Sequence, residues 1–207
     1  MNDVDDLEPI LQRARRRTVW IAAIGAVVGG IGGLALALTD DHGLHGVLTV
    51  IGFACGVGGI AGALSLILTV STYSPDLRVP LAGLDRATRS RINRSIRAGV
   101  PVAPPDGELA RRGADRARAL ALLLPYQTAQ LALLYVGIGG VQLPQLTSDD
   151  PWQFWFSRIF LLAIVLVGAF FALFTRRKVA AARRYLRAVE AQRLSSIPNA
   201  GSAPSVR

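Results

Sequence analysis

The sequence predicts an all-α integral membrane protein, in which four transmembrane helices form two hairpins joined by a basic helical cytoplasmic linker. Two observations carry this prediction. Hydrophobic residues make up 51% of the 207-residue chain, and they gather in four long runs that are almost free of charge. The basic residues fall between and beside these runs, in alternate segments of the chain.

Each apolar run is long enough to cross a bilayer, because about 20 apolar residues rising about 1.5 Å each span the hydrocarbon layer. A soluble protein of this size would interleave charged residues along amphipathic helices instead. The first run exceeds the hydrophobic region of a cleaved signal peptide, and a second run follows at once, so we expect it to be retained. The expected spans are 18–39, 44–72, 119–141 and 152–175.

The distribution of basic residues predicts the topology. The short connections within the two hairpins each contain two Asp and no Arg or Lys, whereas the segments 1–17, 73–118 and 176–207 hold 22 of the 23 basic residues. Arg and Lys accumulate on the cytoplasmic side of membranes. Both termini and the linker 73–118 are therefore predicted to be cytoplasmic. The Arg-rich, Lys-poor composition favours a bacterial plasma membrane.

The cytoplasmic segments are expected to be largely helical. A helix over 81–98 would carry an apolar stripe that contains Ile92 and Ile96, and Gly99 followed by Pro101 would end it. A second helix is expected to begin near residue 108, capped by Asp106, and to run into the third span. The fourth span is expected to continue into a cytoplasmic helix over 176–194, with a disordered tail over 195–207.

Small residues four apart follow the first two spans, and in a membrane such residues let two helices approach closely. We expect these spans to pack on each other within one chain; a homo-oligomer or partner-binding face is the alternative. The helix-packing candidates are Gly25, Gly29 and Gly33 in the first span, and Gly52, Gly56, Gly58 and Gly62 in the second.

The second hairpin contains polar residues within its spans. Pro125 is expected to kink the third span. Gln127 and Gln130 share one helix face and are expected to bond to a neighbouring helix; lining a polar path for a small molecule or a lipid headgroup is the alternative. Arg158, near the outer end of the fourth span, is expected to snorkel or to pair with an outer Asp, with an anion contact as the alternative.

Residues that carry chemistry are scarce. No Asp, Glu, Lys or His lies deep in an expected span, which argues against a proton- or ion-coupled transporter. Cys55 is the only cysteine and cannot form an internal disulfide or a cysteine cluster. His42 and His45 lie in or beside the first outer loop and are expected to be solvated. We therefore predict no catalytic residue, no metal and no cofactor, and a protein that is not an enzyme.

The linker helices are strongly basic, which suits an anionic membrane surface. An acidic protein partner is the alternative, and nucleic acid is disfavoured because the first linker helix has no aromatic side chain to stack on bases. The candidate residues for binding anionic lipid or a partner are Arg86, Arg89, Arg91, Arg94, Arg97, Arg111 and Arg112.

Three short stretches of this linker resemble the linker of small actinobacterial multi-pass membrane proteins of unknown function: Leu84-Asp85-Arg86, the run from Arg97 to Pro104, and Leu109-Ala110. In those proteins a helix ends in an Arg-rich Gly-x-Pro-Val-x-x-Pro turn before a Leu-Ala helix enters the next span. The resemblance covers residues 84–110 and implies a layout and an origin but no activity.

These observations together predict a non-enzymatic accessory, assembly or scaffold subunit. It would act through helix packing and a basic cytoplasmic surface. Its expected partners are the anionic inner leaflet and either further copies of the chain or another membrane protein. A small transporter or channel with a polar path along the third span is the alternative.

Overall fold

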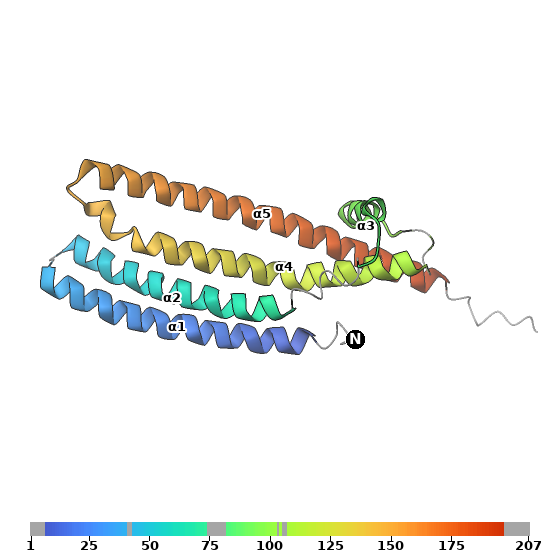
Figure 1. Ribbon diagram of the computed structural model, residues 1–207, viewed down its shortest axis with the longest axis horizontal. Coiled ribbons are helices and arrows are strands. Elements are labelled where there is room, and N and C mark those ends of the chain that lie inside the picture. Colours follow the sequence, from blue (N-terminus) through green and yellow to red (C-terminus); the bar gives the residue numbers. More distant parts are fainter. Residues whose placement is uncertain (1–6, 41–42, 74–81, 103, 105–106, 197–207) are drawn as a thin grey trace, which may run out of the picture. The chain divides into compact units, whose positions relative to one another are not determined.

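A computed structural model describes residues 7–40, 43–73, 82–102, 104 and 107–196 of the chain, and it confirms an all-helical fold: these residues contain no strand (Figure 1). The elements in chain order are α1 (Leu7–Asp40), α2 (Leu44–Tyr73), α3 (Arg86–Ala98), α4 (Glu108–Val141), the 3-10 helix η4 (Pro144–Thr147) and α5 (Pro151–Ser196).

Four of the described helices are long enough and apolar enough to cross a membrane, as the four apolar runs predict. They are α1, α2, α4 and α5. Three of them extend well beyond the predicted spans, because α1 begins at Leu7, α4 begins at Glu108 and α5 continues to Ser196. The linker and the carboxy-terminal segment thus continue the helices of the second pair of spans without a break.

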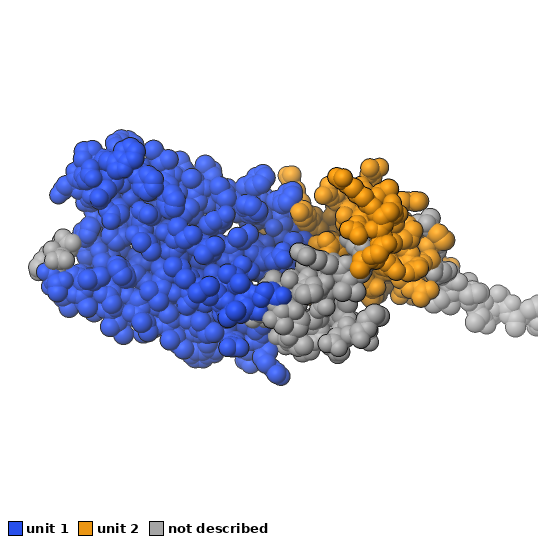
Figure 2. Space-filling model, in the orientation of Figure 1, with its two compact units in different colours: residues 1–73, 123–175 blue, residues 74–122, 176–207 orange. Residues whose placement is uncertain are grey.

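The chain divides into two compact units, which Figure 2 shows in different colours. Unit 1 comprises residues 1–73 and 123–175, and unit 2 comprises residues 74–122 and 176–207. The helices α4 and α5 contribute to both units, and α1 and α2 belong to unit 1 alone.

Within unit 1, α2 is the central helix. It lies side by side with α1 (Figure 1), and its other face meets α4, where Gly59 approaches Gly137. In the most apolar stretch of α2, 39% of the residues are buried, whereas none are buried in that of α5. Among the four helices, α2 is therefore the most buried and α5 the least.

Unit 2 has a hydrophobic core of its own. Its buried members are Ile92 and Ile96 of α3, Ala117 of α4, and Ala182 and Tyr185 of α5. Half-buried leucines and a valine on the same elements pack around this cluster. The apolar stripe predicted for the first linker helix is thus a core-forming face.

The helix α3 is shorter than its apolar pattern predicts, since it begins at Arg86 rather than near residue 81. Asp85 is its N-cap, and its carboxylate accepts the main-chain N–H groups of the second and third helical residues at 3.1 and 3.3 Å. Leu84 lies before the helix but still packs on the core of unit 2. Gly99 ends the helix at φ +71° as predicted, because glycine adopts this left-handed conformation at little cost.

Some predictions fall on residues outside the described ranges. These are the capping role of Asp106, the solvation of His42, and the tail from residue 197 onward. The first two residues assigned to that tail, Ser195 and Ser196, belong to α5.

Candidate functional site

The glycines of α1 lie against the backbone of α2. A β-carbon added to Gly25 would lie 3.1 Å from the Cα atom of Gly58, and one added to Gly33 would lie 2.9 Å from the Cα atom of Val50. A β-carbon on Gly29 would meet the carbonyl oxygen of Phe53 even more closely. Only glycine permits this approach, so the stripe brings α1 and α2 into backbone contact.

The glycines of α2 divide between two faces, whereas the sequence leads us to expect that they pack on the first span. Gly58 and Gly62 lie against Ala22 of α1. Gly52 and Gly56 instead face the end of α4: a β-carbon on Gly52 would lie 2.6 Å from the carbonyl oxygen of Gly140. Because the two pairs lie on different faces of α2, both α1 and α4 approach this helix closely.

His45 lies in the first turn of α2 and is half-buried, not solvated in a loop as predicted. Its Nδ1 atom is 2.7 Å from the hydroxyl oxygen of Thr147 in η4, and its carbonyl accepts the hydroxyl of Thr49 at 3.0 Å. The pair ties the start of α2 to the segment between α4 and α5. In the part of the chain that the structure describes, no three His, Cys, Asp or Glu side chains gather as metal ligands would.

The polar residues of the second pair of spans lie in separate places. Gln127 and Gln130 are half-buried on α4, and neither lines the two cavities of unit 1 described below. Arg158 is exposed on α5, and its guanidinium lies 3.7 Å from the centroid of the Phe154 ring. The sequence predicts that Arg158 snorkels or pairs with an outer Asp. The cation–π contact differs from that pairing, and snorkelling stays a prediction. Pro125 lies inside the continuous helix α4.

Five of the linker arginines lie on α3, whose apolar side is buried in the core of unit 2. At 3.6 residues per turn, Arg86, Arg91, Arg94 and Arg97 lie within the half of α3 opposite Ile92 and Ile96, and all four are exposed. Since the isoleucines are buried in unit 2, α3 has no free apolar stripe to insert into a membrane surface. The exposed face offers positive charge and hydrogen-bond donors only.

Two of the predicted anion-binding arginines make contacts within unit 2. Arg112 donates from Nη1 to the carbonyl of Ala82 at 3.0 Å and from Nε to the carboxylate of Glu108 at 2.9 Å. Arg89 donates from Nε to the carbonyl of Leu84 at 2.8 Å. Arg112 therefore joins the segment before α3 to the first turns of α4. Arg111 is exposed.

The basic surface of unit 2 is larger than the sequence reasoning proposed. The described residues of this unit include sixteen Arg or Lys side chains against four acidic ones. Several of the additional ones are exposed on α5, and Gly99 at the end of α3 lies against Arg184. The arginine-rich stretch 176–187 is a sequence signal for this larger basic surface as well as for the topology.

Other residues missed by the sequence reasoning are structural. Gly137 and Gly140 of α4 receive the glycines of α2, and the Gly-Ile-Gly-Gly run 137–140 was a visible signal for this contact. Tyr185 is fully buried in unit 2. It follows Ala182 by three residues, so the apolar stripe of that helix indicated its position. The contact between His45 and Thr147 had no signal in the sequence.

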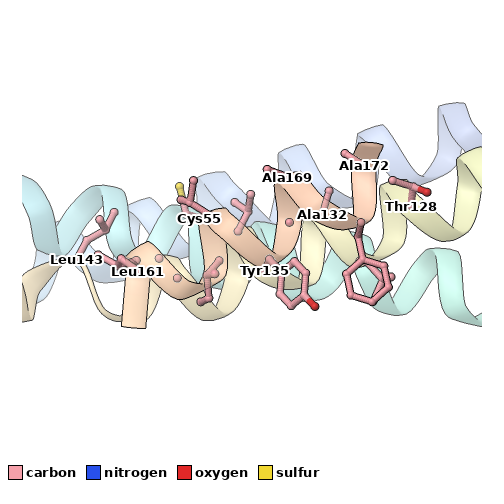
Figure 3. A pocket seen from close by; sticks show the side chains of 16 residues that line it. Cys55, Thr128, Ala132, Tyr135, Leu143, Leu161, Ala169 and Ala172 are labelled. Atoms are coloured by element: carbon pink, nitrogen blue, oxygen red, sulfur yellow. The ribbon is translucent and has the colours of Figure 1, made fainter. Parts of the chain in front are cut away.

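Unit 1 contains two cavities between its helices. One, of about 410 Å³, lies between α4 and α5 with Cys55 of α2 in its wall (Figure 3). The other, of about 570 Å³, is lined by Arg15 and Thr18 of α1 and by Pro125 and Tyr126 of α4. The hydroxyl of Thr18 lies 3.3 Å from that of Ser65 on α2.

No protein-family model, curated protein or solved structure matches this chain.

Proposed function

We propose that this chain is a non-enzymatic scaffold of the bacterial plasma membrane, with both termini cytoplasmic. In this proposal, unit 1 crosses the membrane as two helical hairpins. Unit 2 stands on the cytoplasmic side and presents a basic surface to anionic groups. The layout agrees with the small actinobacterial membrane proteins that the linker resembles.

One observation carries the proposal: α3 buries Ile92 and Ile96 in a core and exposes Arg86, Arg91, Arg94 and Arg97. A helix kept only as a positive flank for topology would need no packed core beneath it. A packed core holds the backbone of α3, and thus the Cα positions of the arginines, in a fixed pattern, which lowers the entropic cost of binding a patterned set of negative charges. Guanidinium groups also suit bidentate contacts with carboxylates and phosphates.

The buried stripe changes how the surface would meet a membrane. An amphipathic helix that lies in the interface inserts its apolar face, and in α3 that face is not available. Attraction to anionic headgroups would then be electrostatic, worth about 1 kcal/mol per basic residue near the surface and screened by salt. An acidic protein segment would satisfy the same arginines.

The glycine stripes give less support to a homo-oligomer. Gly25, Gly29 and Gly33 are occupied by α2 of the same chain. The proposal therefore does not depend on self-association through α1. A transporter or channel also lacks a favouring observation, because Gln127 and Gln130 do not line the cavities of unit 1 described above.

The proposal is tested by replacing the four exposed arginines with glutamine in the full-length protein. Photo-crosslinking in cells from Ser90 on α3, an exposed neutral position, reports what touches this face. We expect crosslinks to an acidic protein or to anionic phospholipid that the Arg→Gln variant loses. A matched Arg→Lys variant keeps the charge and should retain most of them. Crosslinks that are unchanged in the Arg→Gln variant would refute the proposed role of this face.

A further inference from the structure

The cavity between α4 and α5 lies where small residues of the two helices face each other. These are Gly139 on α4, and Gly168 and Ala169 on α5. Leu161 approaches Gly139 at one end, where a β-carbon on that glycine would lie 3.4 Å from Cδ2 of the leucine. Larger side chains such as Ile164 and Phe171 also line the space, of which about 410 Å³ remains open.

The walls of this cavity have the chemistry of hydrocarbon. Of its sixteen lining residues, only Cys55, Thr128 and Tyr135 carry a heteroatom in the side chain, and none is charged (Figure 3). The hydroxyl of Thr128 already donates to the carbonyl of Leu124 at 3.0 Å. The volume lies within the range of about 300–1,000 Å³ typical of ligand pockets. A polar ligand would find little to bond with here.

The cavity is long and follows the helices. Its lining runs from Thr128 to Gly140 on α4 and from Leu161 to Ala172 on α5, which at 1.5 Å per residue is about 18 Å and about 17 Å. Such a groove suits an extended chain better than a compact molecule.

The mouth of the groove is continuous with an apolar surface. Val136, Val165 and Phe171 line it and are themselves 50%, 64% and 39% exposed. If unit 1 lies in a bilayer, these side chains contact lipid, and an unfilled groove beside them would forfeit dispersion contacts on both walls. A lipid chain that leaves the bulk phase to enter the groove restores those contacts.

We infer that the groove between α4 and α5 binds one acyl chain of a membrane phospholipid as a resident ligand. The inference goes beyond the scaffold function and shares with it only the membrane location of unit 1. The bound chain would fill the gap between α4 and α5 and would complete the bundle.

Cys55 offers a direct test, because it is the only cysteine of the chain and it lines the groove. The full-length protein is delipidated in a bile-salt detergent without long alkyl chains, and alkylation of Cys55 by N-ethylmaleimide is timed. Added dioleoylphosphatidylglycerol should slow the reaction about tenfold, which corresponds to 1.4 kcal/mol. Dihexanoylphosphatidylglycerol has the same headgroup and chains too short to fill the groove, and it should give no protection.

Matched variants locate the effect. Ala169→Leu and Ala172→Leu fill the groove, whereas Ala163→Leu adds the same bulk to an exposed position of α5 outside it. Native mass spectrometry should find one retained phospholipid on the wild-type protein and on Ala163→Leu, and about tenfold less on the two groove variants.

Three results would overturn the inference. The first is an alkylation rate that long-chain phospholipid does not change in the wild-type protein. The second is equal protection by the short-chain lipid, which would assign binding to the headgroup. The third is protection that follows protein concentration rather than lipid, which would place a second copy in the groove. The wild-type measurement needs no variant to fold, and none of these results bears on crosslinking from α3.

Discussion

At the residue scale, the effect of a glycine in this protein depends on its neighbours and not on the motif to which it belongs. Gly29 and Gly32 lie three positions apart in α1. A β-carbon on Gly29 would collide with the carbonyl oxygen of Phe53, whereas one on Gly32 would meet nothing within 4 Å. The two positions form a matched pair on one helix.

We predict that Gly29→Ala destabilises the protein by about 1–3 kcal/mol, because the added methyl group forces α1 away from α2. Gly32→Ala should change stability by no more than about 0.5 kcal/mol, as is usual for a surface substitution. Unfolding of the detergent-solubilised protein by sodium dodecyl sulfate measures both. Equal effects of the two substitutions would contradict the close contact.

A second pair of residues tests the core of unit 2. A β-carbon on Gly113 would lie 2.6 Å from the hydroxyl oxygen of Tyr185 but 3.5 Å from the ring carbon that carries it. That hydroxyl is buried and has no hydrogen-bond partner of good geometry among the described residues. The phenol oxygen is therefore the atom that requires glycine at position 113.

We predict that Gly113→Ala costs about 1–3 kcal/mol through overpacking. Tyr185→Phe should cost little, because the hydroxyl makes no hydrogen bond of good geometry and has only a weak main-chain contact at Val102. In the double variant the cost of Gly113→Ala should shrink, since the colliding oxygen is gone. A double-mutant cycle on the full-length protein, read by amide exchange of α3, measures the coupling, and simple additivity would refute it.

The sequence predicts residues of this kind only in part. The spacing of Gly25, Gly29 and Gly33 indicates a face for close packing, and Ile92 and Ile96 indicate an apolar stripe. It cannot say that Gly52 and Gly56 face α4 while Gly58 and Gly62 face α1. Small residues on a central helix all look alike in sequence, and which neighbour each one meets depends on how three helices are arranged in space.

At the scale of elements, α3 shows how a short basic helix keeps its boundaries. The helix is short and poor in apolar residues, and its five arginines repel one another. The cap at each end therefore matters more than in a long helix. Asp85 fixes the start, and Gly99 fixes the end. Hydrogen bonds from the side chain of Thr88, and from the main-chain N–H groups of Thr88 and Ala87, hold the pKa of Asp85 below its ordinary value.

This pKa shift predicts how the stability of α3 depends on pH. The ionised carboxylate is favoured in the folded state, so its contribution is complete above the pKa of the unfolded chain and is lost as the pH falls through the lower, folded value. The protection of the first-turn amides of α3, measured against the exchange of unstructured peptide at the same pH, should therefore fall at acid pH. Asp85→Asn keeps an acceptor at the N-cap without titrating there, so its protection should lack this acid-dependent loss. An equal loss of protection in both proteins would contradict the role of the carboxylate.

Some helix boundaries follow from sequence patterns, and others depend on tertiary packing. The continuity of α4 from Glu108 and of α5 to Ser196 follows from patterns that are legible in the sequence. The late start of α3 does not, because Leu84 continues the apolar stripe of that helix. Leu84 still packs on the core of unit 2 from outside the helix, which an apolar pattern alone cannot reveal.

At the scale of the whole molecule, four helices suited to a membrane and a separate basic unit form one chain. Their orientation across a membrane is predicted by charge alone, since Arg and Lys resist translocation whereas acidic residues contribute little. The connection around Asp149 has no basic residue, and α3 has five arginines. These two exposed segments should therefore lie on opposite sides.

Single cysteines at these two places test the orientation in living cells. In a Cys55→Ser background, Asp149→Cys should react with a membrane-impermeant maleimide in intact cells, whereas Ser90→Cys should react only after the membrane is permeabilised. Both positions are exposed in the structure, so differences in burial do not explain a difference in labelling. Neither change alters the number of basic residues that set the topology. Labelling of Ser90→Cys in intact cells would place unit 2 outside and would remove the basis for a cytoplasmic scaffold, while leaving the groove between α4 and α5 untouched.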